Sequence, residues 1–206
     1  YPAMEEYRVE IFIDKGPNAR SVQIAVAPFT LVCATTREGL LTAPLRSRFG
    51  VFEKLEPYPE ADLVRILERS AGILDVTLVP EAALEIARRA RGIPRLANRF
   101  LRRVRDFAQV SGKRKVGVDT AEEAMLRLGV DPEGLDAVDR KILANLVASG
   151  GRPVGLKTLA AAIAEEEETI EEVYEPFLIQ RGFVEKTSKG RVATKRAIEK
   201  MEKTGA

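Results

Sequence analysis

The chain has 206 residues, of which 45% are hydrophobic and 31% are charged, a balance typical of a folded globular protein with one large domain or two to three small ones. It contains no histidine and one cysteine, which excludes thiolate or imidazole metal centres, Ser-His-Asp triads and disulfides within this sequence. Because the formal net charge is only +2, any nucleic-acid binding must depend on local patches of charge.

The first predicted elements are two short strands with alternating apolar residues, at residues 8–13 and 21–26. The loop between them contains glycine, proline and asparagine, which are typical turn residues. The pattern therefore predicts a β-hairpin. From the residues alone, a purely structural hairpin is the simpler interpretation.

A short apolar run at residues 31–34 predicts a buried strand of a covered parallel sheet, with Cys33 acting as a small hydrophobic side chain. Two threonines follow at the carboxyl end of this strand, where open α/β sheets bind ligands. A short helix opened by Pro44 then leads to Arg48. An arginine at a subunit edge can reach a neighbour's phosphate, whereas the residues alone favour an ordinary strand, loop and solvated arginine.

Residues 51–55 predict another strand, and the two prolines of residues 56–59 predict a linker and a domain boundary. Tyr58 in this linker either stacks on a nucleotide base or packs between domains, and the residues do not separate these two roles. Four helices are predicted after it, and they begin at Pro59, Pro80, Pro94 and Thr120.

The final 70 or so residues predict three helices followed by a two-stranded hairpin, which is the order of a winged helix. The third helix is expected to be capped by Thr169 and is acidic, so it is a poor reader of bases in the major groove. Positive charge lies on the wing, at Lys186, Lys189 and Arg191. Such a wing can bind the DNA backbone without reading sequence, although a wing used only for protein contacts remains an alternative.

One segment, ATTREGLLTAPLRSRFG at residues 34–50, resembles the sensor-1 to arginine-finger region of AAA+ motors. Together with YPAME at the start and GIPR at residues 92–95, it is similar to the RuvB family, the bacterial Holliday-junction branch-migration motors. The resemblance runs through nearly the whole chain in the family's order. It implies three parts: the distal part of an AAA+ α/β domain (residues 1–56), a helical lid (57–130) and a C-terminal winged-helix DNA-binding domain (131–206).

The resemblance also implies roles for individual residues. Thr36 would be the sensor-1 residue and Arg48 the arginine finger that completes a neighbour's ATP site. Arg46 is a nearby second candidate for the finger, and the match at Arg48-Phe49-Gly50 favours Arg48. Arg95, preceded by Pro94, would be the sensor-2 arginine. The hairpin would bind the junction-binding partner RuvA through a set of apolar residues, namely Ile11, Phe12, Ile13 and Ile24.

As implied by the resemblance, the intact protein is an ATP-hydrolysing DNA helicase that uses ATP/ADP and Mg²⁺, forms a homo-oligomeric ring (a hexamer), and acts on double-stranded DNA with RuvA and a RuvC-type resolvase. A cytoplasmic location with no membrane contact is expected. The sequence contains no G-x-x-x-x-G-K-[ST] phosphate loop, so this chain alone is expected to be inactive and to leave Mg²⁺ to an upstream segment. The alternative is a non-enzymatic winged-helix DNA-binding or adaptor protein.

Overall fold

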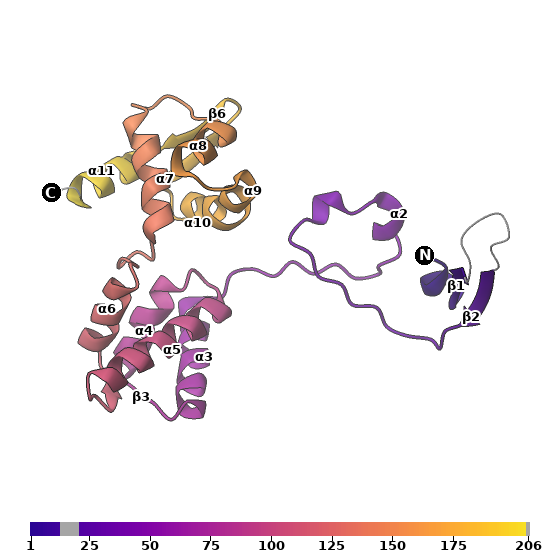
Figure 1. Cartoon of the computed structure of the whole chain (residues 1–206), viewed down its shortest axis with the longest axis horizontal. Helices are drawn as coiled ribbons and strands as arrows, with labels where there is room; N and C mark the ends of the chain where they lie inside the picture. Colours follow the sequence, from indigo (N-terminus) through magenta and orange to yellow (C-terminus); the bar gives the residue numbers. More distant parts are fainter. Residues whose placement is uncertain (13–20, 205–206) are drawn as a thin grey trace. The chain divides into compact units, whose positions relative to one another are not determined.

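The computed structural model describes residues 1–12 and 21–204, which divide into two compact units, Tyr1–Leu55 and Glu56–Ala206 (Figure 1). Ile13, expected in the hairpin, lies outside the described residues. No described helix combines the length and the apolar composition needed to cross a membrane.

The first unit contains the predicted hairpin. Its strands β1 and β2 pair antiparallel, with Val9 opposite Ile24 and Ile11 opposite Val22, so the prediction of a hairpin is confirmed. The remaining elements are one turn or less long. In chain order the unit consists of α1 (Pro2–Glu5), β1 (Arg8–Phe12), β2 (Ser21–Ala25), the 3-10 turn η1 (Glu38–Leu40) and α2 (Ala43–Arg46).

Two predicted strands, at residues 31–34 and 51–55, are absent, and both predictions are wrong. A strand of a covered sheet exists only where neighbouring strands satisfy its backbone groups. Among the described residues none pairs with either segment, so no ladder forms. Their side chains are accordingly exposed, including Val32 at 85% and Cys33, which the pattern placed in a buried strand.

The four predicted helices beyond the linker are present and surround one apolar core built from residues such as Leu63, Ile86, Leu101 and Met125. A two-residue parallel bridge, which the pattern did not predict, joins the loops after the first and third helices. The elements of this bundle are α3 (Glu60–Ile73), β3 (Thr77–Leu78), α4 (Pro80–Arg89), α5 (Pro94–Val110), β4 (Lys115–Val116) and α6 (Val118–Arg127).

The winged-helix order is also present, around a second core that includes Leu143, Leu146, Phe183 and Leu178. Asp136 and Asp139 form a capping box at the start of the first helix of this domain. The elements are α7 (Ala137–Ala148), α8 (Leu156–Ile163), α9 (Glu167–Thr169), the π-helical segment η2 (Ile170–Tyr174), α10 (Glu175–Gln180), β5 (Val184–Thr187), β6 (Gly190–Ala193) and α11 (Lys195–Thr204).

Three local details of the helices differ from expectation. α6 begins at Val118 rather than at Thr120, after Gly117 and without a side-chain cap. Thr169 is not a cap, because the acidic helix already begins at Glu167 and continues through the π-helical segment. α11 was not predicted, although Ala197 packs into the core from this helix.

Candidate functional site

Arg48 follows α2 closely and is held within the first unit by three partners. Its guanidinium lies 2.8 Å from the Glu5 carboxylate and 4.3 Å above the ring of Tyr1, and it donates to the carbonyl of Pro44. The side chain is 21% exposed, and its Nε has no hydrogen-bond partner in the described chain. Arg48 is therefore a positioned arginine rather than a freely solvated one.

The residues around Arg48 also form a hollow of about 800 Å³ within the first unit, which Thr30, Leu31 and Glu53 help to line. Thr36 is exposed, and no hydrogen bond of its hydroxyl is found in the described chain. The neighbouring Thr35 behaves differently, because its hydroxyl accepts a hydrogen bond from the Arg37 N–H at 2.9 Å. The hydroxyl of Thr36 is thus accessible for a ligand.

The residues expected to contact nucleotide in the second unit come together at the start of α5. The Tyr58 N–H donates to the carbonyl of Gly92 at 2.8 Å, which ties the linker to the turn before the helix. Pro94 occupies the first position of α5, and Arg95 follows it with an exposed side chain. A helix N-terminus with an exposed guanidinium favours an anion such as a phosphate, and the exposed ring of Tyr58 is free to stack on a base.

The hairpin carries an exposed apolar face of four residues. Paired residues of antiparallel strands share a face, so Val9, Ile24, Ile11 and Val22 lie on one side of the hairpin. Each of these side chains is between 38% and 47% exposed. Ile11 and Ile24 were expected on this face; Val9 and Val22 were missed, although the same alternation marks them.

The wing differs from expectation at Arg191. This side chain is only 8% exposed, and it donates from Nε and Nη2 to the two carboxylate oxygens of Glu175, at 2.8 and 2.9 Å. These hydrogen bonds are the main reason that the pKa of Arg191 lies above its usual range. The expectation that Arg191 binds DNA stays a prediction, but the structure shows its Nε and Nη2 already engaged by the buried carboxylate of Glu175.

The other two wing cations differ from each other. Lys186 lies 2.9 Å from Glu171 and 3.7 Å from Glu175, so its charge is shared with the acidic helix. Lys189, at the turn between β5 and β6, is exposed and has no carboxylate within ion-pair distance in the described chain. Two carboxylates of the acidic helix, Glu171 and Glu175, thus pair with cations of the wing.

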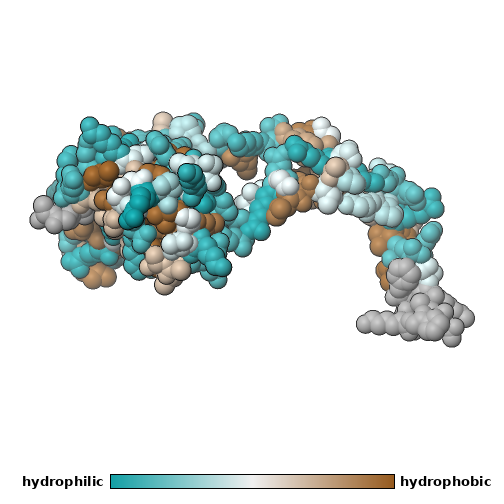
Figure 2. Space-filling view, turned by 90° about the horizontal axis from the view of Figure 1, so that it is seen from above, coloured by the Kyte–Doolittle hydropathy of each residue, from teal (hydrophilic) through white to brown (hydrophobic). Residues whose placement is uncertain are grey.

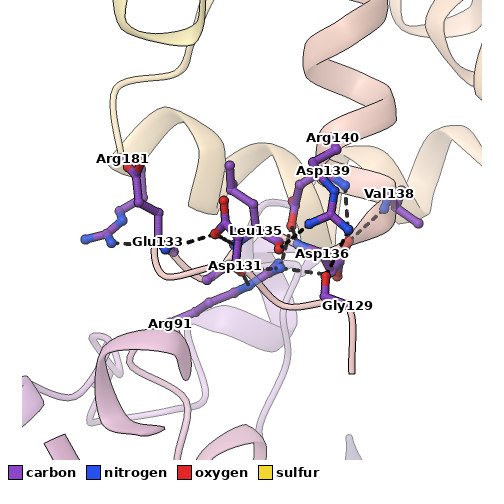
Figure 3. Close-up of polar contacts among 11 residues, drawn as sticks. Arg91, Gly129, Asp131, Glu133, Leu135, Asp136, Val138, Asp139, Arg140 and Arg181 are labelled. Carbon is purple, nitrogen blue, oxygen red and sulfur yellow. Dashed lines mark hydrogen bonds and ion pairs between the residues drawn. The ribbon is translucent and has the colours of Figure 1, made fainter. Parts of the chain in front are cut away.

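A buried polar cluster at the start of α7 was not anticipated. Arg91 reaches it from the α4–α5 turn, and its guanidinium contacts the carboxylates of Asp136 and Asp139 (Figure 3). Asp139 is fully buried, and this burial raises its pKa to about 6 despite the opposing effect of Arg91. A carboxylate at the third position of a capped helix was the only signal of this cluster in the sequence.

Among the described residues, no group of three or more histidine, cysteine or acidic side chains is placed to hold a metal ion. On the face seen in Figure 2, hydrophilic residues surround scattered hydrophobic ones on the Glu56–Ala206 unit. The candidate ligand-binding residues described above lie in both units. Thr36 and Arg48 belong to the first unit, and the start of α5 and the wing belong to the second.

Three protein-family models match the chain consecutively. They are the Holliday junction DNA helicase RuvB P-loop domain at residues 1–55, the RuvB AAA lid domain at 58–131 and the RuvB C-terminal winged helix domain at 132–202. Curated relatives include two proteins named Holliday junction branch migration complex subunit RuvB. The one from Nitratidesulfovibrio vulgaris strain DP4 is 55% identical, and the match covers all of this chain and 64% of the relative. The one from Salinibacter ruber is 54% identical, and the match covers 99% of this chain and 60% of the relative. The chain thus spans about two thirds or less of the length of these relatives.

Solved structures match as well. The Thermotoga maritima RuvB Holliday junction branch migration motor superposes with a TM-score of 0.81 at 45% identity, over 86% of this chain and 60% of the other. A proline-to-glycine variant of that protein superposes with a TM-score of 0.86 at 41% identity, and the match covers 98% of this chain and 64% of the variant. The consecutive family matches, the identities and the superpositions agree, and the chain belongs to the RuvB family.

Proposed function

We propose that the intact protein is an ATP-driven DNA motor that moves Holliday junctions along duplex DNA during recombination and repair. It would act as a ring of six identical subunits and work with RuvA and a RuvC-type resolvase. The observation that carries this proposal is the arrangement at the start of α5. There a hydrogen bond from the Tyr58 backbone N–H to the Gly92 carbonyl ties Tyr58, whose ring is exposed, to the turn that leads into α5 and Arg95. The cytoplasm is the compartment proposed for this activity.

In this proposal, separate residues of the chain bind the nucleotide and assist its hydrolysis. Arg95 and the N-terminus of α5 bind the phosphates, and Tyr58 stacks on the base. Thr36 orients the attacking water, while Arg48 reaches the nucleotide of a neighbouring subunit. When bound, ATP with Mg²⁺ supplies the phosphoryl-transfer chemistry, and no residue of this chain is assigned to the metal.

Solved variants of the Thermotoga maritima motor support these assignments. A threonine and an arginine that were substituted in that protein lie twelve positions apart, and the substituted proline lies forty-six positions after the arginine. The same two spacings separate Thr36 from Arg48 and Arg48 from Pro94. The matching spacing supports the view that the two chains have corresponding residues at these positions.

The remaining surfaces are assigned to partners. The exposed hairpin face of Val9, Ile11, Val22 and Ile24 suits an apolar docking surface of RuvA, and Phe12 belongs to the same strand. In this proposal Lys189 contacts the DNA backbone, and Lys186 adds to the positive electrostatic potential of the wing. Arg191 stabilises the wing through its buried ion pair with Glu175.

The test is the ATP turnover of the intact protein on junction DNA after the change Arg48→Ala. Loss of an arginine finger lowers turnover by about 10³-fold or more. Arg46→Ala is the matched control, because Arg46 lies two residues away, is half exposed and pairs with Glu38. If Arg48→Ala and Arg46→Ala both leave turnover unchanged, the non-enzymatic DNA-binding or adaptor role becomes the better explanation.

A further inference from the structure

The connection between the helical bundle and the winged helix, residues 129–136, is braced from both sides by polar contacts. Asp131 accepts hydrogen bonds from the N–H groups of Glu133 and Leu135, both at 2.9 Å. Lys200 of α11 lies 2.8 Å from Asp131, and Arg140 of α7 donates to the carbonyls of Gly129 and Leu135. A connection whose backbone groups are satisfied in this way has little freedom to bend.

Two lid residues enter this connection: Arg89 of α4 donates from Nε to the Asp131 carbonyl at 3.1 Å, and Arg91 follows from the α4–α5 turn (Figure 3). The Arg91 guanidinium donates to the carbonyl of Gly134 at 3.1 and 2.8 Å, lies 3.2 Å from Asp136, contacts Asp139, and stacks 4.3 Å from the ring centre of Phe177 in α10. The side chain is 9% exposed. One arginine thus contacts the connection, the start of α7 and α10 together.

The backbone at Arg91 is strained, which shows how strongly the side-chain contacts of this residue hold it in place. The residue has a φ of +55°, in the left-handed region that an L-residue other than glycine adopts only with backbone strain. Glycine, which occupies the next position, would avoid that strain. The contacts of the Arg91 side chain offset the strain of its backbone.

Arg91 also lies on the same turn as Arg95. Only Gly92, Ile93 and Pro94 separate the two arginines, and Pro94 already belongs to α5. Arg91 is buried against the winged helix, whereas Arg95 is exposed at the first turn of α5. If nucleotide binding moves this turn, the buried contacts of Arg91 with Asp136, Asp139 and Phe177 transmit the movement to the winged helix.

We infer that Arg91 is a positioning residue that couples the nucleotide-reading turn of the lid to the DNA-contacting winged helix, so that both move as one body. This inference rests on the proposed function, and it assigns the coupling to one buried side chain. Because only 9% of the Arg91 side chain is exposed, it is assigned to neither nucleotide nor DNA. Its removal should therefore separate ATP turnover from movement of the junction.

The experiment measures ATP turnover and branch-migration rate of the intact protein on junction DNA for Arg91→Met, Arg91→Lys and the control Arg88→Met. Arg91→Met keeps most of the volume and loses every side-chain hydrogen bond. Arg88 is an exposed arginine near the end of α4, three residues before Arg91. We expect turnover to stay within about threefold while migration falls by about tenfold or more, with Arg91→Lys in between, as for a coupling of typical size. Arg88→Met should change neither rate.

A parallel loss of turnover and migration together with a lower melting temperature would show a purely structural role and overturn the inference. Two unchanged rates would overturn it as well. If Arg91→Met does not fold, Asp136→Asn replaces it, because asparagine caps α7 equally well but weakens the pairing with Arg91. Failure of the proposed function itself is recognised separately, because the unaltered protein would then show neither turnover nor migration.

Discussion

The buried pair of Arg191 and Glu175 makes a sharp prediction about the wing. Glu175 is 5% exposed, so the change Arg191→Ala leaves a buried carboxylate whose main partner has gone. Breaking a buried ion pair by removing one member costs about 3–5 kcal/mol. Because Lys186 remains 3.7 Å from Glu175, we expect the lower end, about 3 kcal/mol.

The protein contains two separate cores, so the measurement must report on the winged helix alone. Amide hydrogen exchange at the paired residues of β5 and β6 gives the local free energy of opening. A loss of about 3 kcal/mol accelerates exchange by roughly 150-fold where exchange follows the equilibrium of fast opening and closing. The double change Glu175→Leu with Arg191→Met should recover most of this loss, because an apolar pair replaces a buried ionic one at little cost.

Lys189→Ala is the matched control on the same wing. This exposed side chain should affect stability by less than about 0.5 kcal/mol. It should instead weaken duplex binding by the intact protein. If Arg191→Ala left exchange unchanged and lowered duplex affinity as Lys189→Ala does, Arg191 would be a DNA contact and the reasoning from its burial would be refuted.

Two further predictions concern the connection between the domains. Because the pKa of Asp139 is about 6 in the folded protein against an ordinary 3.8, its contribution to stability is fully present below pH 3.8 and is lost as pH rises through 6, a change of about 3 kcal/mol. The difference in unfolding free energy between the unaltered chain and Asp139→Asn should follow this titration, and a difference independent of pH would contradict it. Gly134→Ala should destabilise by about 1–3 kcal/mol, because φ is +82° and a Cβ would lie 3.1 Å from the Arg89 carbonyl oxygen. Gly150→Ala is its control, since φ is +64° there but no atom lies within 4 Å, and equal losses in melting experiments would show that the contact with Arg89 does not matter.

Local patterns in the sequence were sufficient for the helical parts of the fold. The proline that opens α5 and the apolar stripe through Phe100 and Val104 predict a helix from Pro94 to about residue 110, and the structure has those bounds. The wing was equally clear, because two short strands flank a turn at Lys189. Each of these elements is specified by residues within a few positions of one another.

The errors arose where the outcome depends on distant partners. Residues 31–34 read as a buried strand, yet a strand requires neighbours that local composition does not report. Arg191 read as an exposed cation because Glu175, its partner, lies sixteen residues earlier on a helix. Arg91 gave no signal at all, since its partners Asp136 and Asp139 are more than forty residues away.

The scarcity of free charge on the wing has a consequence for how firmly one copy of the protein holds DNA. Of the three wing cations, only Lys189 lacks a carboxylate partner within the described part of the chain. One such contact holds a duplex weakly, but a second copy linked to the first binds at an effective concentration of roughly millimolar. In the proposed ring, high affinity for DNA therefore comes from all the subunits together. Any single wing can dissociate from the duplex while the wings of neighbouring subunits remain bound.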